Sequence, residues 1–191
     1  DEETKRRQEE GLNILMGLEE NRRLVIQGPP GSGKSTFAIH MIDRLCRKEG
    51  KSGIYICWNQ LLREEVRTRL MTMGLDIQDS QLRMELFYDM VCDLAADIDD
   101  SGLQPSHDKV SKGEMRQLVK SVIHKLPKQK HPGKFDFAII DEAQDLFDKG
   151  IDLLLQSLLK ENNPLQKGNY FIFYDDSQDY PDNNKTSELY V

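Results

Sequence analysis

The sequence lacks the long apolar runs and leader segments that mark membrane and secreted proteins. No apolar stretch approaches the ~20 residues that a helix needs to cross a bilayer. The first residues are mostly charged and do not look like a secretory signal. We therefore expect a cytoplasmic protein that has no membrane partner.

Cysteine is scarce, and neither cysteine nor histidine is spaced for metal binding. The chain has three cysteines without C-x-x-C or Cys/His spacing, which predicts reduced, buried thiols: Cys46, Cys57 and Cys92. The four histidines also lack metal-ligand spacing, so we assign them surface or packing roles: His40, His107, His124 and His131. These absences argue against a disulfide framework and a zinc site.

A basic excess is missing as well, since the formal net charge is -7. Nucleic-acid binding needs a basic surface to neutralise phosphates, so this charge argues at first against such a partner. However, the acidity is concentrated after residue 134, whereas residues 1 to 134 are close to neutral. Because a groove can be basic on an acidic chain, net charge neither establishes nor excludes nucleic acid as a partner.

Short apolar runs alternate with amphipathic segments along the 191 residues, a length that suits one sizeable core. Strands are predicted at residues 24–26, 54–57, 82–86, 137–140 and 170–174. Helices are predicted at residues 8–20, 34–49, 62–70, 87–96, 114–125 and 151–159. This alternation predicts an α/β domain with a mostly parallel sheet covered on both faces. The polar stretch at about 97–134 is interpreted as an insertion that contains one helix.

One glycine-rich segment carries the strongest chemical signal. The pattern G-x-x-x-x-G-K-[ST] is satisfied by Gly28, Pro29, Pro30, Gly31, Ser32, Gly33, Lys34 and Ser35, and Thr36 completes the predicted binding set. The segment lies between a predicted strand and a predicted helix, where glycines let successive amides point toward anionic oxygens. We expect an ATP cradle in which Lys34 reaches the β and γ phosphates and Ser35 ligates Mg²⁺.

A second acidic element completes this site in the sequence. The apolar run Phe137 to Ile140 ends in Asp141 and Glu142. Phosphoryl transfer requires positioning and electrostatic stabilisation, so we expect Asp141 to hold the magnesium shell. Glu142 is expected to orient or deprotonate the attacking water. A solvated acidic strand end is the alternative interpretation of the pair.

The residues Asp141-Glu142-Ala143-Gln144-Asp145 read DEAQD, which resembles motif II of the superfamily 1A helicases. Residues 174–180 resemble that family's motif III, and the resemblance implies that Gln178, with Asp175 beside it, senses the γ phosphate. Residues 56–62 resemble motif Ia, a DNA-contacting segment. Gln8 corresponds in position to the family's adenine-reading glutamine.

The resemblance implies a RecA-like first motor domain that couples Mg·ATP hydrolysis to movement on single-stranded DNA or RNA. It also implies a second, C-terminal RecA-like domain of the same protein, for which no candidate follows Tyr180. Because that domain supplies arginines that stabilise the transition state, we expect weak hydrolysis from this module alone. The family's large DNA-binding subdomain is replaced here by the short stretch at about 97–134.

Other functions stay open at this level. A nucleotide-dependent switch, or a phosphate-starvation-type ATPase with a similar DEAQ element, would bind ATP without acting on nucleic acid. A small-molecule kinase shares the P-loop, but it needs an acceptor pocket and lid arginines that DEAQD does not predict. Trp58 is consistent with base stacking or with packing, and packing is preferred. The lysines at 125, 128, 130 and 134 suit either a phosphate backbone or a solvated loop.

Overall fold

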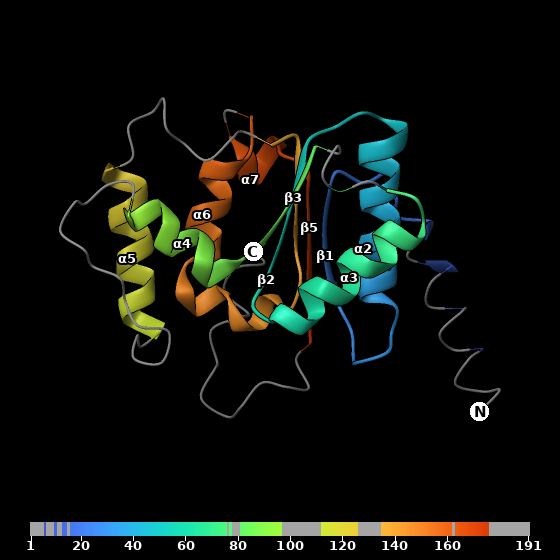
Figure 1. The fold of residues 1–191 in the computed structure, drawn as a ribbon, viewed down its shortest axis with the longest axis horizontal. Coiled ribbons are helices and arrows are strands. Elements are labelled where there is room, and N and C mark those ends of the chain that lie inside the picture. Colours follow the sequence, from blue (N-terminus) through green and yellow to red (C-terminus); the bar gives the residue numbers. More distant parts are fainter. Residues whose placement is uncertain are drawn as a thin grey trace.

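The chain folds around a parallel sheet in a computed structural model (Figure 1). The structure describes residues 6, 10, 13, 14, 16–75, 77, 81–96, 112–125, 135–161 and 163–175. The strands are β1 (Arg23–Gln27), β2 (Gly53–Cys57), β3 (Leu82–Leu86), β4 (Phe137–Ile140) and β5 (Tyr170–Tyr174). They lie in the order β1-β5-β4-β2-β3, and every neighbouring pair is parallel. The predicted strands and the mostly parallel sheet are confirmed.

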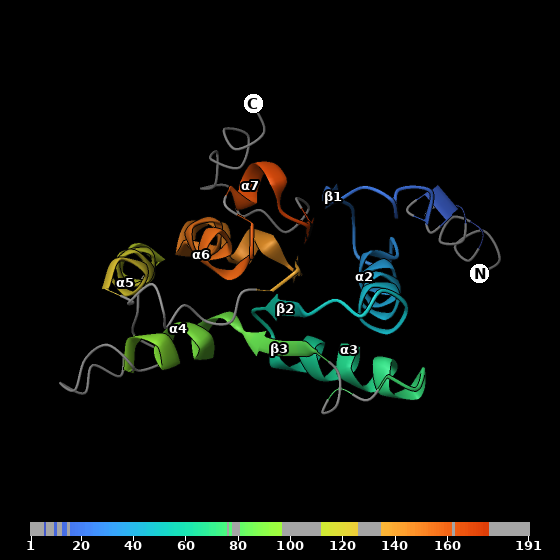
Figure 2. The ribbon, with the colours of Figure 1, turned by 90° about the horizontal axis from the view of Figure 1, so that it is seen from above.

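Helices cover both faces of the sheet. The longer ones are α2 (Lys34–Asp43), α3 (Gln60–Thr72), α4 (Phe87–Ala96), α5 (Lys112–Lys125) and α6 (Ile151–Leu158). Shorter turns are η1 (Arg44–Lys48), η2 (Ala143–Asp145), η3 (Phe147–Lys149) and α7 (Pro164–Lys167). Seen from above, α2 and α3 lie on one side of the sheet, and α4, α5 and α6 lie on the other (Figure 2). This is the layered α/β architecture of a RecA-like P-loop domain.

Strand alternation divides the core into two apolar clusters, one on each face. In β2, Tyr55 and Cys57 pack with α2 and α3, whereas Ile54 and Ile56 pack with α4, α5 and α6. Successive side chains of a strand point to opposite faces, and a central parallel strand must therefore be apolar throughout. Gly53 opens β2 because an added Cβ would lie only 2.0 Å from the ring of Phe137.

Helix α5 is the described part of the predicted 97–134 insertion, and it packs into the core. Its residues Met115, Val119 and Val122 are buried in the cluster shared with α4 and α6. Arg116 donates to both carboxylate oxygens of Asp152 on α6, at 2.8 and 3.0 Å. The helix therefore belongs to the layer that covers one face of the sheet.

Two local predictions need correction. The helix predicted at 34–49 changes after Asp43 into the wider π-helical turn η1, in which Glu49 N donates to Arg44 O. Of the cysteines, Cys57 is buried, but Cys46 and Cys92 are only half-buried. Burial nevertheless raises the pKa of the Cys46 and Cys57 thiols to about 12, so both stay protonated.

Among the described residues, no helix has the length and apolar character of a membrane span.

Candidate nucleotide-binding site

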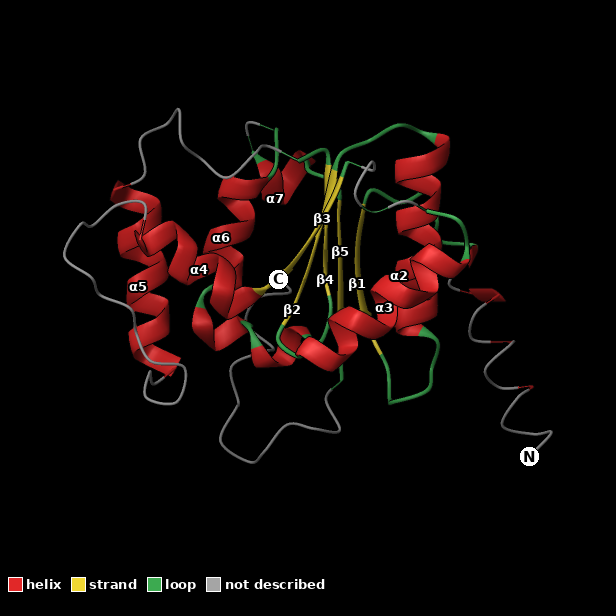
Figure 3. Cartoon of the chain, in the orientation of Figure 1, coloured by secondary structure: helices red, strands yellow, loops and turns green. Residues whose placement is uncertain are grey.

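The glycine-rich loop lies at the carboxyl end of the sheet, between β1 and α2 (Figure 3). Gly31 and Gly33 have φ angles of 78° and 93°, which L side chains adopt only with strain. At Gly28 an added Cβ would lie 2.7 Å from Ser32 Oγ, and Gly28 N donates to Tyr174 O at 3.1 Å. This backbone path therefore requires glycine at Gly31 and Gly33, and it favours glycine at Gly28.

Lys34 is buried at the first position of α2. Its Nζ donates to the carbonyl oxygens of Gly28 and Pro29, the second at 3.1 Å. Gly33 precedes the helix, and no side chain caps the first amides of α2. A helix N-terminus with uncapped amides and a lysine turned into the loop is suited to a polyphosphate.

Asp141 follows β4 and is fully buried. Its Oδ2 accepts hydrogen bonds from Ser35 Oγ at 3.3 Å and from Tyr55 Oη at 3.0 Å, and its Oδ1 accepts from Glu142 N at 3.1 Å. Burial raises the pKa of the Asp141 carboxyl to about 6, whereas the hydrogen bond from Tyr55 opposes that rise. Because burial makes the charged form of this carboxylate less stable, a bound cation would stabilise it.

Ser35 and Asp141 are 106 positions apart in the chain, yet the fold places them in contact. A hydroxyl oxygen and a carboxylate oxygen are hard ligands, and Mg²⁺ is usually held by one or two such groups together with substrate phosphates. The two predicted metal ligands therefore fit a magnesium ion. When bound, the ion supplies charge neutralisation between the phosphates.

Glu142 has an unusual backbone. Its φ and ψ angles are 53° and 46°, and it is the sole non-glycine residue with positive φ in the described part of the chain. Holding a non-glycine residue there costs about 1–2 kcal/mol, and such strain concentrates at functional sites. The side chain accepts a hydrogen bond at Oε2 from Gln144 Nε2.

The structure does not bring every predicted residue together. Pro29, Pro30 and Thr36 are in or beside the loop but their side chains are exposed. Gln8 and Gln178 lie outside the described residues, so their predicted roles in adenine and γ-phosphate recognition stay predictions. Sequence reasoning missed Tyr55, whose only signal was a hydroxyl within a buried strand that needed a partner.

Trp58 follows β2 at the same end of the sheet. It is half-buried and packs against the cluster of α4, α5 and α6, which confirms the preferred packing role. Lys149 Nζ lies 4.2 Å from the centroid of its ring. This cation–π contact ties the segment after β4 to the end of β2.

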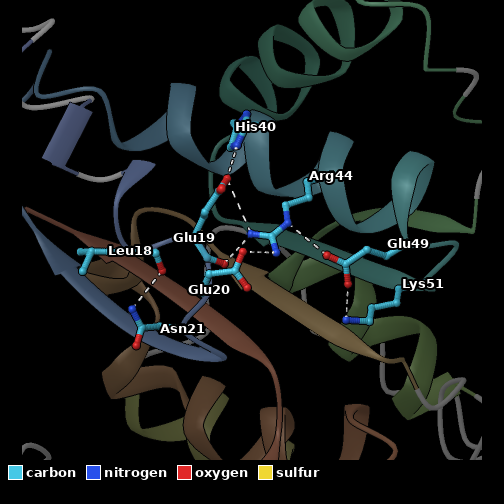
Figure 4. Close-up of polar contacts among 8 residues, drawn as sticks. All are labelled: Leu18, Glu19, Glu20, Asn21, His40, Arg44, Glu49 and Lys51. Atoms are coloured by element: carbon cyan, nitrogen blue, oxygen red, sulfur yellow. Dashed lines mark hydrogen bonds and ion pairs between the residues drawn. The ribbon is translucent and has the colours of Figure 1, made fainter.

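A polar network anchors the chain ahead of β1 to helix α2 and to the turn η1 (Figure 4). His40 Nε2 lies 2.9 Å from Glu19 Oε2. Arg44 donates to Glu19 O at 2.8 Å and to Glu20 Oε1 at 2.9 Å, and it lies 3.1 Å from Glu49 Oε1. His40 is half-buried in this network, which agrees with the surface or packing role predicted for it. The network holds the segment that leads into the strand before the phosphate loop.

A model of the KaiC ATPase family matches residues 9–150, which include the phosphate loop, Asp141 and Glu142. The chain belongs to the KaiC ATPase family. As a KaiC-family, RecA-like P-loop protein it is a nucleotide-binding ATPase domain. The match does not extend to the narrower resemblance to superfamily 1A helicases, which stays a prediction.

Proposed function

We propose that this KaiC-family ATPase hydrolyses Mg·ATP at the phosphate loop and acts as the first motor domain of a superfamily 1 type enzyme on nucleic acid. The observation that carries the catalytic part is the contact of Ser35 with Asp141 at 3.3 Å, with Glu142 next in the chain. It unites both halves of a phosphoryl-transfer site at the carboxyl end of one sheet.

Each residue of the site then has a physical task. Lys34 leaves the carbonyls of Gly28 and Pro29 and donates to the β and γ phosphates, whose charge makes them stronger acceptors. Ser35 and Asp141 would hold the magnesium ion that accompanies the phosphates. Glu142 orients the attacking water and accepts its proton. Gln178, by resemblance, senses the γ phosphate.

The motor part of the proposal is supported by the DEAQD sequence and by the order of the similar segments along the chain. Gln144 of DEAQD accepts a hydrogen bond from the backbone N–H of Asp175, the second residue of the segment 174–180 that resembles motif III. Opening and closing of a cleft against a second RecA-like domain would couple the presence of the γ phosphate to the affinity for the nucleic-acid strand. Arginines from that domain would raise the hydrolysis rate.

A stand-alone ATPase or nucleotide-dependent switch that does not act on nucleic acid is the second candidate. The match to the KaiC ATPase family favours it as much as it favours a motor domain, because the shared feature is the ATPase site.

Single-stranded DNA and RNA separate these candidates. We would measure ATP hydrolysis by the 191-residue chain with Mg²⁺, with and without oligonucleotide, beside Lys34→Ala as the inactive reference. The motor proposal predicts a rate increase of about tenfold or more on adding the oligonucleotide, or tighter oligonucleotide binding when ATP is present, through linkage between the two ligands. If hydrolysis and binding are both independent of nucleic acid, the switch is the better description.

A further inference from the structure

Gln144 is buried in η2, and both ends of its side-chain amide are engaged. Nε2 donates to Glu142 Oε2, two residues back in the chain. Oε1 accepts from Asp175 N at 3.1 Å, 31 positions further on and immediately after β5. One side chain therefore connects the carboxylate that follows β4 with the backbone that follows the adjacent strand.

The hydrogen bond from Gln144 is important for Glu142 because the backbone of Glu142 has an uncommon, left-handed conformation. Glu142 lies between β4 and η2 with φ and ψ of 53° and 46°, outside any regular helix or strand. Asp145 N donates to Glu142 O at 3.1 Å and holds the backbone, whereas the amide of Gln144 holds the carboxylate. With Oε2 engaged, Oε1 is left to accept from a water molecule.

We infer that Gln144 is a positioning residue for ATP hydrolysis, which holds the Glu142 carboxylate and links it to the backbone after β5. The inference rests on the proposed role of Glu142 in orienting the attacking water. A movement of the backbone at Asp175 changes the position of the amide, and the amide changes the position of the carboxylate. The link makes hydrolysis sensitive to the position of the backbone at Asp175, directly after β5.

The first test separates turnover from binding in the 191-residue chain. Gln144→Leu removes both hydrogen bonds, and Gln144→Glu keeps an acceptor for Asp175 N but places a carboxylate against Glu142. Gln156→Leu, at an exposed position of α6, is the matched control. We expect the single-turnover rate with radiolabelled Mg·ATP to fall by about 10- to 100-fold in both Gln144 variants, the loss typical of misplaced catalytic groups. The Kd for Mg·ADP should stay within about twofold of the parent, because a positioning residue affects kcat rather than ground-state binding.

A double-mutant cycle asks whether Gln144 acts through Glu142. If it does, Glu142→Gln and the double variant Glu142→Gln/Gln144→Leu have the same residual rate. Parent-like turnover by Glu142→Gln would overturn the proposed function itself. Lost turnover in Glu142→Gln beside parent-like turnover in both Gln144 variants would overturn only the role of Gln144.

A second measurement does not depend on turnover. Amide hydrogen exchange followed by NMR reports directly on Asp175 N–H. We expect its exchange to become at least about tenfold faster in Gln144→Leu, since its acceptor is removed, and to be unchanged in Gln156→Leu. Glu142→Gln should shift the same resonance through the amide. Parent-like exchange at Asp175 in a folded Gln144→Leu protein would overturn the link between Gln144 and Asp175. If that variant does not fold, an unshifted Asp175 resonance in Glu142→Gln would overturn the link instead.

Discussion

The two halves of the candidate site are built in different ways. Residues 28 to 35 form the phosphate loop from backbone, with two glycines at positive φ and the uncapped amides of α2. The acidic half instead depends on side chains brought from distant positions, because Asp141 is contacted by Ser35 and by Tyr55 on β2. The loop can therefore be recognised from local sequence, whereas the acidic half acquires its properties from its neighbours.

The electrostatic settings of the two halves also differ. Lys34 is a buried cation whose ammonium already donates to two carbonyl oxygens. Asp141 is a fully buried carboxylate whose pKa is raised to about 6 by desolvation. The half with Lys34 therefore favours binding of an anion, and a bound cation would stabilise the charged carboxylate in the half with Asp141. In the proposed function, Mg·ATP supplies both charges, the phosphates beside Lys34 and the magnesium ion beside Asp141.

The largest effect on nucleotide binding is expected from removing the cation of the loop. Lys34→Ala should weaken Mg·ADP binding by about 100-fold, since a charge-assisted contact is worth up to about 3 kcal/mol. Thermal stabilisation by Mg·ADP measures this loss, and Lys48→Ala, at an exposed site in η1, is the control. Undiminished stabilisation of the Lys34→Ala protein would show that the loop does not bind phosphate.

Glu142→Gln should spare binding and remove turnover. A general base contributes about 100- to 10,000-fold to a rate, and the amide cannot accept the proton. Titration with Mg·ADP and a single-turnover assay give the two quantities from the same preparation. Glu161→Gln, in an exposed ion pair with Arg22, controls for the loss of one negative charge. Equal loss of binding and turnover would assign Glu142 to the cradle instead.

Asp141→Asn tests how much the buried carboxylate lowers the free energy of unfolding. The pKa of this group is about 6 in the folded chain and 3.8 in the unfolded chain. The folded state therefore binds more protons between these values, and the group lowers the free energy of unfolding as pH rises from about 4 to about 6. Without Mg²⁺ at pH 7.5, the asparagine variant should be more stable than the parent by about 1–3 kcal/mol.

Urea unfolding at pH 4 and pH 7.5 measures this difference, and the stability gap between the two proteins should shrink at the lower pH. A gap that is the same at both pH values would mean that the carboxylate is not destabilised by burial. Adding Mg²⁺ with ADP should reverse the order at pH 7.5, since only the parent retains the metal ligand.

The smallest effect is expected at Tyr55. Tyr55→Phe keeps the ring in the core but removes the hydrogen bond to Asp141 Oδ2. The Mg²⁺ concentration needed for ADP binding should rise by about five- to tenfold, because partners of metal ligands orient them. Tyr170→Phe is the control, since its hydroxyl donates to Leu165 O away from the site. An unchanged magnesium requirement would limit Tyr55 to packing.

Much of the fold follows from local pattern. The apolar run Ile54 to Cys57 predicts a buried strand because its side chains must face both layers, and the structure buries all of them. The run of 87–96 predicts helix α4 with the same bounds. The helix predicted at 34–49 was less accurate, since its periodicity could not reveal the wider turn of η1.

Local sequence was enough to locate the glycine-rich loop and to predict phosphate binding there, because the glycines, the lysine and the start of the helix lie next to one another in the chain. It also identified Asp141 and Glu142 as the acids that follow a buried strand. The strand order β1-β5-β4-β2-β3 and the two hydroxyls that contact Asp141 could be learned from the folded structure alone. The folded structure also revealed the contact of Gln144 with Asp175. The physical reason is that these contacts depend on how strands pair across the sheet, and no local periodicity records that pairing.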